Sequence, residues 1–104
     1  MSEPKFETLG AVFESVATRN WRHSLYGATR PPWTADTQCV VLERDTYSTE
    51  VPEFAAKQSL REVLSVHQVQ DIVENARQQL PAPSVDDLVR AFNFYFARDA
   101  FIRF

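Results

Sequence analysis

The chain has 104 residues, so we expect a single domain over residues 1–104. Its 11 basic and 14 acidic residues give a net charge of −3, and no run of Lys or Arg occurs, so no nucleic-acid partner is expected. The single cysteine, Cys39, the absence of a signal-peptide pattern and the lack of an apolar stretch of about 18 residues predict a cytoplasmic protein with no membrane partner.

Apolar residues near the N-terminus recur at spacings of three and four, which is the period of one helix face. They predict a helix that begins near Glu3 or Pro4 and ends near Thr18, with Pro4 in the first turn. The residues of its apolar face are Phe6, Leu9, Val12, Phe13 and Val16.

Residues 19–37 predict a long connection, because the Pro31-Pro32 pair forbids a helix or a central strand. We expect a short strand over about residues 22–26, and we expect Trp33 to fold back onto the core. Residues 38–44 contain a short apolar run rich in β-branched side chains, which predicts a strand buried on both faces.

The segment over residues 45–53 is polar and rich in turn-forming residues, and it predicts an exposed acidic loop. One helical turn is expected at residues 54–57. The apolar spacing in residues 60–64 fits either a short strand or a helical turn, and we favour the strand.

Two capping patterns mark the C-terminal helices. Ser65 and Gln68 match the capping box, which predicts a helix that continues until the prolines at positions 81 and 83 stop it. Ser84, followed by acids in the first turn, predicts the start of a last helix. Because this helix carries apolar residues on more than one side, we expect it to be central, and residues 101–104 to close the core as a turn or strand.

These elements together predict an α+β fold. We expect three main helices packed on a small, mainly antiparallel sheet of two to four strands. The eight Phe, three Tyr and two Trp suit the core of a small domain, since each buried aromatic side chain removes about 150–250 Å² from water.

The residues able to perform chemistry are few and dispersed. Cys39 could pair with His23 or His67 as a nucleophilic dyad, but Cys39 lies in an apolar run, where a buried thiol is inert. Zinc sites need about four Cys or His ligands at short spacings, and the two glycines belong to no phosphate-binding loop. We therefore expect no catalytic residues, no metal and no cofactor.

Acidic residues are the better binding candidates. The set that would form an acidic patch if the fold gathers it is Asp36, Glu43, Asp45, Glu50 and Glu53. The alternative is a solvated surface with ordinary charge. An acidic excess suits a basic protein partner, because opposite electrostatic fields speed encounter.

Several aromatic residues fall in the expected loops or strand ends. They are Trp21, Tyr26, Trp33 and Tyr47. Interfaces favour Trp and Tyr, so some could be hot spots, and closing the core is the alternative. The aromatic run at residues 92–96 is expected to pack in the core and not to stack on bases, because only Arg90 and Arg98 accompany it.

Three stretches carry a family resemblance: residues 33–42 (WTADTQCVVL), 64–79 (LSVHQVQDIVENARQQ) and 91–102 (AFNFYFARDAFI). Their motifs are a strand, helix caps and core positions. They resemble small bacterial proteins similar to the immunity proteins of contact-dependent inhibition and related polymorphic toxin systems. The resemblance implies a non-enzymatic protein that binds a cognate toxin domain and blocks its active site.

Many toxins of this kind are nucleases with basic clefts, which an acidic loop could enter by mimicking phosphate. The expected contacts are Asp45, Glu50 and Glu53, with Tyr47 or Trp33 as apolar anchors. We expect a monomer or a 1:1 heterocomplex. Two other hypotheses remain open: an adaptor or regulatory subunit of another bacterial complex, and a small-molecule enzyme or binder with a deep pocket.

Overall fold

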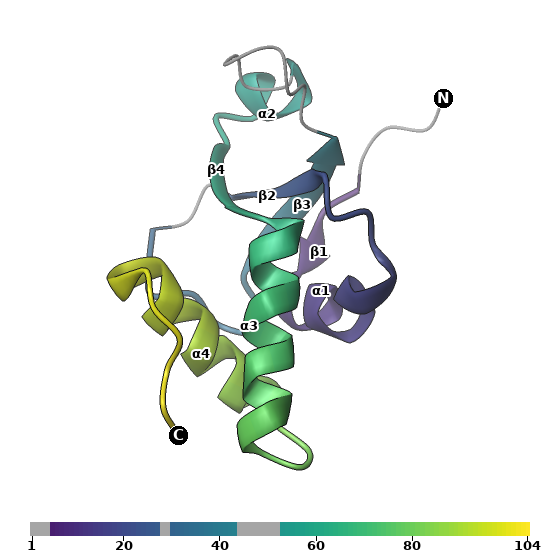
Figure 1. Cartoon of the computed structure of the whole chain (residues 1–104). Coiled ribbons are helices and arrows are strands. Elements are labelled where there is room, and N and C mark those ends of the chain that lie inside the picture. The colour runs from purple at the N-terminus through teal and green to yellow at the C-terminus, as the bar shows by residue number, and fades with distance from the viewer. Residues whose placement is uncertain (1–4, 28–29, 44–52) are drawn as a thin grey trace.

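The computed structural model describes residues 5–27, 30–43 and 53–104. Its elements are β1 (Glu7–Thr8), α1 (Leu9–Ser15), the 3-10 helix η1 (Val16–Thr18), β2 (His23–Gly27), β3 (Gln38–Glu43), α2 (Glu53–Lys57), β4 (Arg61–Ser65), α3 (Val66–Gln79) and α4 (Val85–Arg98). The strands form one antiparallel sheet in the order β1-β3-β2-β4, and α1, α3 and α4 gather on one side of it (Figure 1). The predicted α+β class is confirmed.

Strand β3 is buried on both faces, as its apolar run predicts. On one face, Cys39 belongs to the large core cluster that the helices complete, and Val41 packs against this cluster. The other face carries a smaller cluster, which consists of Tyr26, Val40, Leu42, Ala55 and Leu60. Helix α2 and the start of β4 therefore close the side of the sheet that the main helices leave open.

The first helix begins later than the sequence predicts. Glu7 and Thr8 pair with β3 instead of entering the helix, and α1 starts at Leu9. The Thr8 hydroxyl accepts a hydrogen bond from the Ala11 N–H at 3.2 Å, so Thr8 is the N-cap. Phe6 consequently lies outside the apolar face of the helix and is exposed.

The two capping patterns predict the later helix starts correctly. In α3 the Ser65 hydroxyl accepts from the Gln68 N–H at 3.1 Å, and the Gln68 side chain accepts from the Ser65 N–H at 2.9 Å. Ser84 and Asp87 form the same reciprocal pair at the start of α4. These local contacts set the beginnings of both helices.

Helix α4 is not central, contrary to its expected place. The face formed by Leu88, Ala91 and Phe92 is buried against α1 and α3, whereas Val85 and Phe96 are exposed. The helix is apolar on more sides than its neighbours cover, because no other described helix or strand packs on its outer side and the C-terminal segment covers it only in part (Figure 1). Part of the aromatic run at residues 92–96 therefore lies at the surface.

Side-chain amides on α3 and α4 hold segments that are not regular structure. Asn93 accepts from the Trp33 N–H and donates to the Trp33 carbonyl, each at 2.8 Å. Gln70 donates to the carbonyls of Val16 and Arg19 at 2.9 and 3.0 Å. The connection before β3 and the end of η1 are thereby fixed to the helices.

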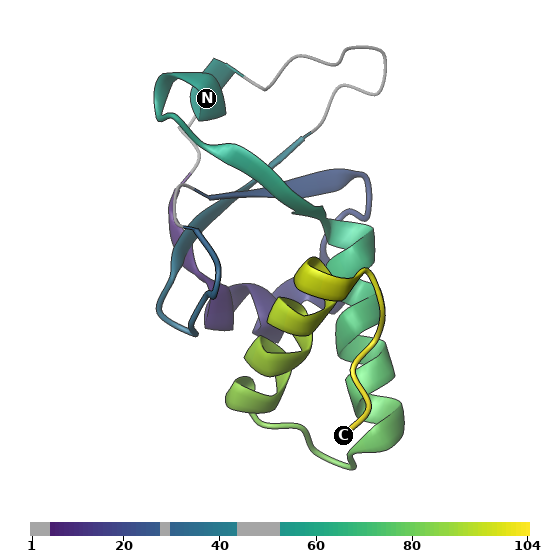
Figure 2. The same ribbon diagram turned by 90° about the vertical axis from the view of Figure 1, so that its left-hand side faces the viewer.

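The C-terminal segment is neither a turn of helix nor a strand. It turns back after α4 and runs alongside α3 and α4 (Figures 1 and 2). Ile102 is buried, while Phe101 and Phe104 are exposed, so the segment closes the core with one side chain. Gln79 fixes it by donating to the Ile102 carbonyl at 2.8 Å and accepting from the Phe104 N–H at 3.0 Å.

Candidate functional site

Trp33 is a core residue in this structure and not a surface anchor. Its side chain is 5% exposed, and its ring packs edge-on against Phe92 and Phe96 at centroid distances of 5.4 and 4.6 Å. The expectation that it folds back onto the core is confirmed. A partner could reach its indole ring only after rearrangement of the connection that Asn93 holds.

The described part of the acidic set does not form one cluster. Asp36 precedes β3 and Glu43 ends it, and both are exposed. A six-residue strand places its two ends about 17 Å apart, so these two carboxylates do not share a patch. Asp45, Tyr47 and Glu50 lie outside the described residues, and of Glu53 only its backbone place at the start of α2 is described.

The aromatic residues expected in loops or strand ends divide between surface and core. Tyr26 is buried in the smaller cluster. Trp21 is 56% exposed, and the Arg22 guanidinium lies over its ring at 5.2 Å. Its indole also meets His67 edge-on at 6.1 Å. Trp21 is thus a solvent-facing aromatic that contributes little to the core.

Cys39 is a buried thiol with its hydrogen bond directed into the protein. Its S–H donates to the Glu7 carbonyl at 3.4 Å. Burial raises the pKa of the Cys39 thiol from 9.0 to about 12, the negative charge of Glu7 adds to the rise, and Arg19 opposes it. The side chain therefore stays protonated at neutral pH, whereas nucleophilic attack needs the thiolate.

The histidines lie far from this thiol. In the β2–β3 ladder, Cys39 pairs with Gly27, whereas His23 pairs with Glu43 at the opposite end. Four residues of strand separate the two positions, which is about 13 Å. His67 is exposed in the first turn of α3, 3.5 Å from the Asp71 carboxylate. The fold does not assemble the three side chains into one site.

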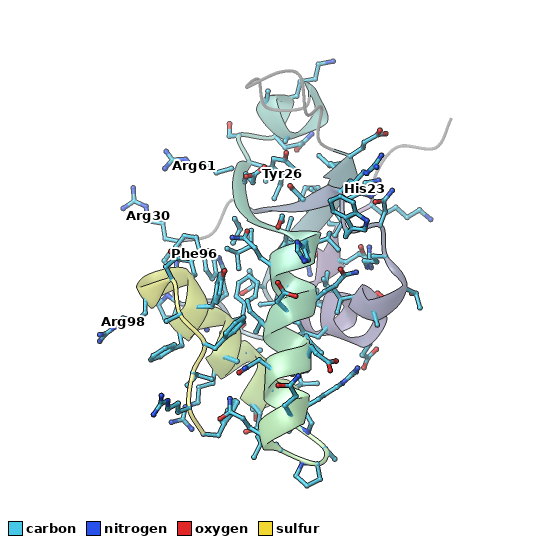
Figure 3. All side chains as sticks on the ribbon, viewed as in Figure 1. His23, Tyr26, Arg30, Arg61, Phe96 and Arg98 are labelled. Atoms are coloured by element: carbon cyan, nitrogen blue, oxygen red, sulfur yellow. The ribbon has the colours of Figure 1, made fainter. Side chains whose placement is uncertain are left out.

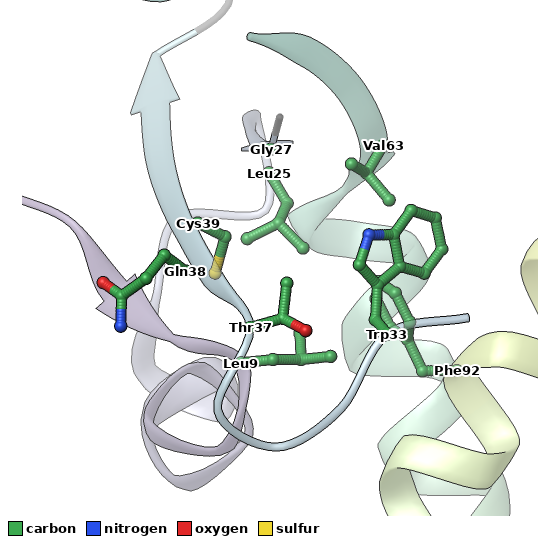
Figure 4. A pocket seen from close by; sticks show the side chains of 9 residues that line it. All are labelled: Leu9, Leu25, Gly27, Trp33, Thr37, Gln38, Cys39, Val63 and Phe92. Atoms are coloured by element: carbon green, nitrogen blue, oxygen red, sulfur yellow. The ribbon is translucent and has the colours of Figure 1, made fainter. Parts of the chain in front are cut away.

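The core beneath the sheet contains a small cavity of about 10 Å³ (Figure 4). Leu9, Leu25, Trp33, Cys39 and Phe92 are among the residues that line it. This volume is about that of one water probe, well below the roughly 300–1,000 Å³ of a small-molecule site. Within the described ranges, no three His, Cys, Asp or Glu side chains converge as they would around a metal ion.

A larger hollow lies at the surface, between α4 and the C-terminal segment. We call it the C-terminal groove. It encloses about 670 Å³, and it is lined by Arg90, Asn93 and Phe94 from α4 and by residues 100–103. Phe101 is 44% exposed at this place, and its ring meets that of Tyr95 at 5.4 Å. An apolar surface with cationic edges is therefore open to solvent here.

The charge around this groove is opposite to that of the whole molecule. Residues 88–104 contain three arginines and one acid, Asp99, which gives a local charge of +2 in a chain of net charge −3. Arg90, Arg98 and Arg103 are exposed, and no described carboxylate lies within 4.0 Å of them. Figure 3 shows Arg98 projecting outward from α4. The dipole of α4 favours a cation in the last turn of the helix, which explains the position of Arg98. It does not explain the positions of Arg90 and Arg103.

The comparison with protein families gives one match. The model of a family described as a domain of unknown function, DUF7716, matches residues 6–104. The chain belongs to this family. No curated protein matches the chain, and no solved structure does. The DUF7716 match spans the sheet, the main helices and the C-terminal segment, so the groove lies within the family domain.

In the part of the chain that the structure describes, no helix combines the length and the apolar character that crossing a bilayer requires.

Proposed function

We propose that this DUF7716 chain acts by binding another protein and not by catalysis, and that α4 and the C-terminal segment carry the binding surface. The observation that supports this is the exposure of Phe96, Phe101 and Phe104 beside arginines that have no described carboxylate within 4.0 Å. Protein interfaces are enriched in aromatic residues and Arg. Burying these side chains against a partner would remove apolar area from water at about 25 cal/mol per Å².

For the partner we retain the class that the resemblance implies, a bacterial toxin domain whose active site is blocked in a 1:1 complex in the cytoplasm. The filled core and the protonated Cys39 thiol favour a binding protein over a small-molecule enzyme. An adaptor or regulatory subunit would use the same surface, and it remains the alternative.

The test compares two exposed aromatic residues on different parts of the molecule. The full chain and its Phe101→Ala and Trp21→Ala variants are titrated calorimetrically against the partner that co-purifies with the chain. We expect a 1:1 complex whose affinity falls about tenfold with Phe101→Ala, as for an interface hot spot, and is unchanged by Trp21→Ala. Equal affinities for all three proteins would refute the assigned surface.

A second measurement separates the two partner classes. If the partner is a toxin domain, its activity should fall to zero at one equivalent of added chain. A partner that keeps its activity when fully bound would favour an adaptor.

The predicted acidic loop over residues 45–53 is tested in the same titration. Charge reversal by Glu50→Lys with Glu53→Lys should weaken binding at low salt if this segment also contacts a basic cleft. Unchanged binding would remove the acidic loop from the proposal.

A further inference from the structure

We infer that the C-terminal groove binds a short acidic segment of a partner protein, in which an apolar side chain lies between carboxylates. This inference rests on the proposed function, because the groove is part of the surface assigned there. It adds the chemistry of the partner, which the exposed aromatic residues alone do not define.

The groove has two walls that the fold holds in place. Helix α4 supplies one wall, and the C-terminal segment supplies the other. Gln79 fixes the second wall through its two hydrogen bonds to the backbone of Ile102 and Phe104. A ligand therefore meets a shape that already exists, which lowers the ordering cost of binding.

Cations stand on both walls. Arg90 lines the groove from α4 and Arg103 lines it from the C-terminal segment, and neither has a described carboxylate within 4.0 Å. A guanidinium group binds a carboxylate through two parallel N–H donors, which gives direction as well as charge. Two such groups on opposite walls suit a ligand with carboxylates on either side of its centre.

The groove between these cations is apolar. Phe94 is half-buried in its wall, and the exposed ring of Phe101 faces the same hollow, with Ala100 and Ile102 beside it. Aromatic rings offer a large contact area at low conformational cost. The central group of the ligand is therefore an aromatic or aliphatic side chain, because a purely acidic strand would leave the apolar surface of the groove exposed to water.

A nucleic acid fits these observations less well. Phosphate-backbone binding draws on many cations in a continuous track, whereas residues 88–104 supply three arginines. The net charge of −3 would also repel a polyanion at long range. A short segment with two to four carboxylates carries far less charge, so this repulsion is weaker for it, and it can meet the local charge of +2 at close range.

The experiment uses the full chain and two synthetic peptides, each blocked at both ends and labelled with an uncharged fluorophore. The acidic peptide has the sequence EDFDE, and the basic control has the sequence KKFKK. Fluorescence anisotropy should show saturable binding of the acidic peptide that weakens as salt rises, and no binding of the basic one. Arg90→Glu combined with Arg103→Glu should weaken acidic-peptide binding about tenfold or more, and Phe101→Ala should weaken it several-fold.

Matched controls keep the result specific to the groove. Arg22→Glu makes the same charge change at an exposed arginine beside Trp21, and Trp21→Ala removes an exposed aromatic ring there. Both controls should bind the acidic peptide like the unaltered chain. Circular dichroism and the melting temperature show whether each variant is folded, and the single variants Arg90→Glu and Arg103→Glu replace the double variant if it is not.

Four outcomes of the binding measurements would overturn the inference, and a fifth concerns self-association of the chain. The four are failure of the acidic peptide to bind, equal binding of the basic peptide, an equal loss in the Arg22→Glu control, and tighter binding of a labelled ten-residue oligothymidylate that the Arg90→Glu/Arg103→Glu variant abolishes. Self-association of the chain that Arg103→Glu removes would assign the groove to a second copy and would also overturn it.

Failure of this inference and failure of the proposed function give different results. If the acidic peptide does not bind but Phe101→Ala still weakens binding of the co-purified partner, the proposed surface is supported and the inference of an acidic ligand is refuted. If the acidic peptide binds at the groove but Phe101→Ala leaves the affinity for the partner unchanged, the inference of an acidic ligand is supported and the proposed function is refuted.

Discussion

Gln70, Gln79 and Asn93 each bond backbone groups of a segment outside the main helices and strands. Buried backbone groups that leave regular structure need other partners, and a carboxamide offers a donor and an acceptor on one planar group. Asn93 meets both the N–H and the carbonyl of Trp33, which lies 60 residues earlier in the chain. Single side chains thus determine where the irregular segments lie.

Replacing Asn93 tests this at the level of stability. Asn93→Ala should lower the free energy of unfolding by about 2 kcal/mol or more, because it removes both hydrogen bonds that the Asn93 amide makes to the backbone of Trp33. Urea unfolding followed by circular dichroism measures the change. Gln78→Ala, which removes an exposed amide from α3, should change stability by less than about 0.5 kcal/mol, and equal losses would contradict the role given to Asn93.

Cys39 predicts a dependence of stability on pH. Below pH 9.0, the ordinary pKa of the thiol, Cys39 is protonated in both the folded and the unfolded chain. Its titration therefore does not change the free energy of unfolding in that range. Between pH 9.0 and about 12 the unfolded chain releases a proton that the folded chain keeps, so the free energy of unfolding should fall as pH rises. Cys39→Ala should flatten this fall between pH 9 and pH 11 in urea titrations, and parallel pH profiles for both proteins would disprove the assignment.

At the scale of elements, the sequence predicts what short-range contacts determine. The capping box at Ser65 and the acidic first turn after Ser84 each lie within four residues, and both helices begin where these patterns predict. The strands at β2, β3 and β4 also appear as predicted. The start of α1 is wrong, because Glu7 pairs with Cys39, 32 residues away, and no local pattern reports such a pairing.

The cap of α4 can be tested by a matched pair of variants. Ser84→Ala should cost about 1 kcal/mol, because the Asp87 N–H loses its acceptor, whereas Ser84→Thr keeps an oxygen there and should cost less. The midpoint of urea unfolding measures the stability of both variants, provided that the slope of the unfolding free energy against urea concentration is unchanged. A threonine variant as unstable as the alanine variant would show that the hydroxyl is not what holds this helix start.

At the scale of the whole molecule, the candidate surface could be predicted only in part. The sequence shows that Arg90 and Arg98 stand among aromatic residues, but the helical pattern alone assigns those aromatics to the core. Their exposure depends on how much of α4 the C-terminal segment and α3 cover, which is a property of the assembled fold. The acidic residues are apparent from the sequence alone, and two of the five, Asp45 and Glu50, lie outside the described residues.

Asp99, the acidic side chain within residues 88–104, provides a charge test with a defined sign. Asp99 ends α4 in the left-handed conformation at φ 52°, which asparagine also tolerates. Asp99→Asn should therefore keep the melting temperature and raise the affinity for the acidic peptide about two- to threefold, since it removes a like charge. Glu14→Gln on α1 makes the same change elsewhere, and an equal gain from it would point to net charge instead of the groove.

The attachment of the C-terminal segment to Gln79 links recognition to the fraying of a neighbouring helix. Gln79 is the last residue of α3, and terminal turns open more readily than helix centres. Each opening would release Ile102 and Phe104 together and widen the groove without unfolding the sheet. Hydrogen exchange should then show the amide of Phe104 exchanging at the rate of the last turn of α3, and ligand binding should slow both at once.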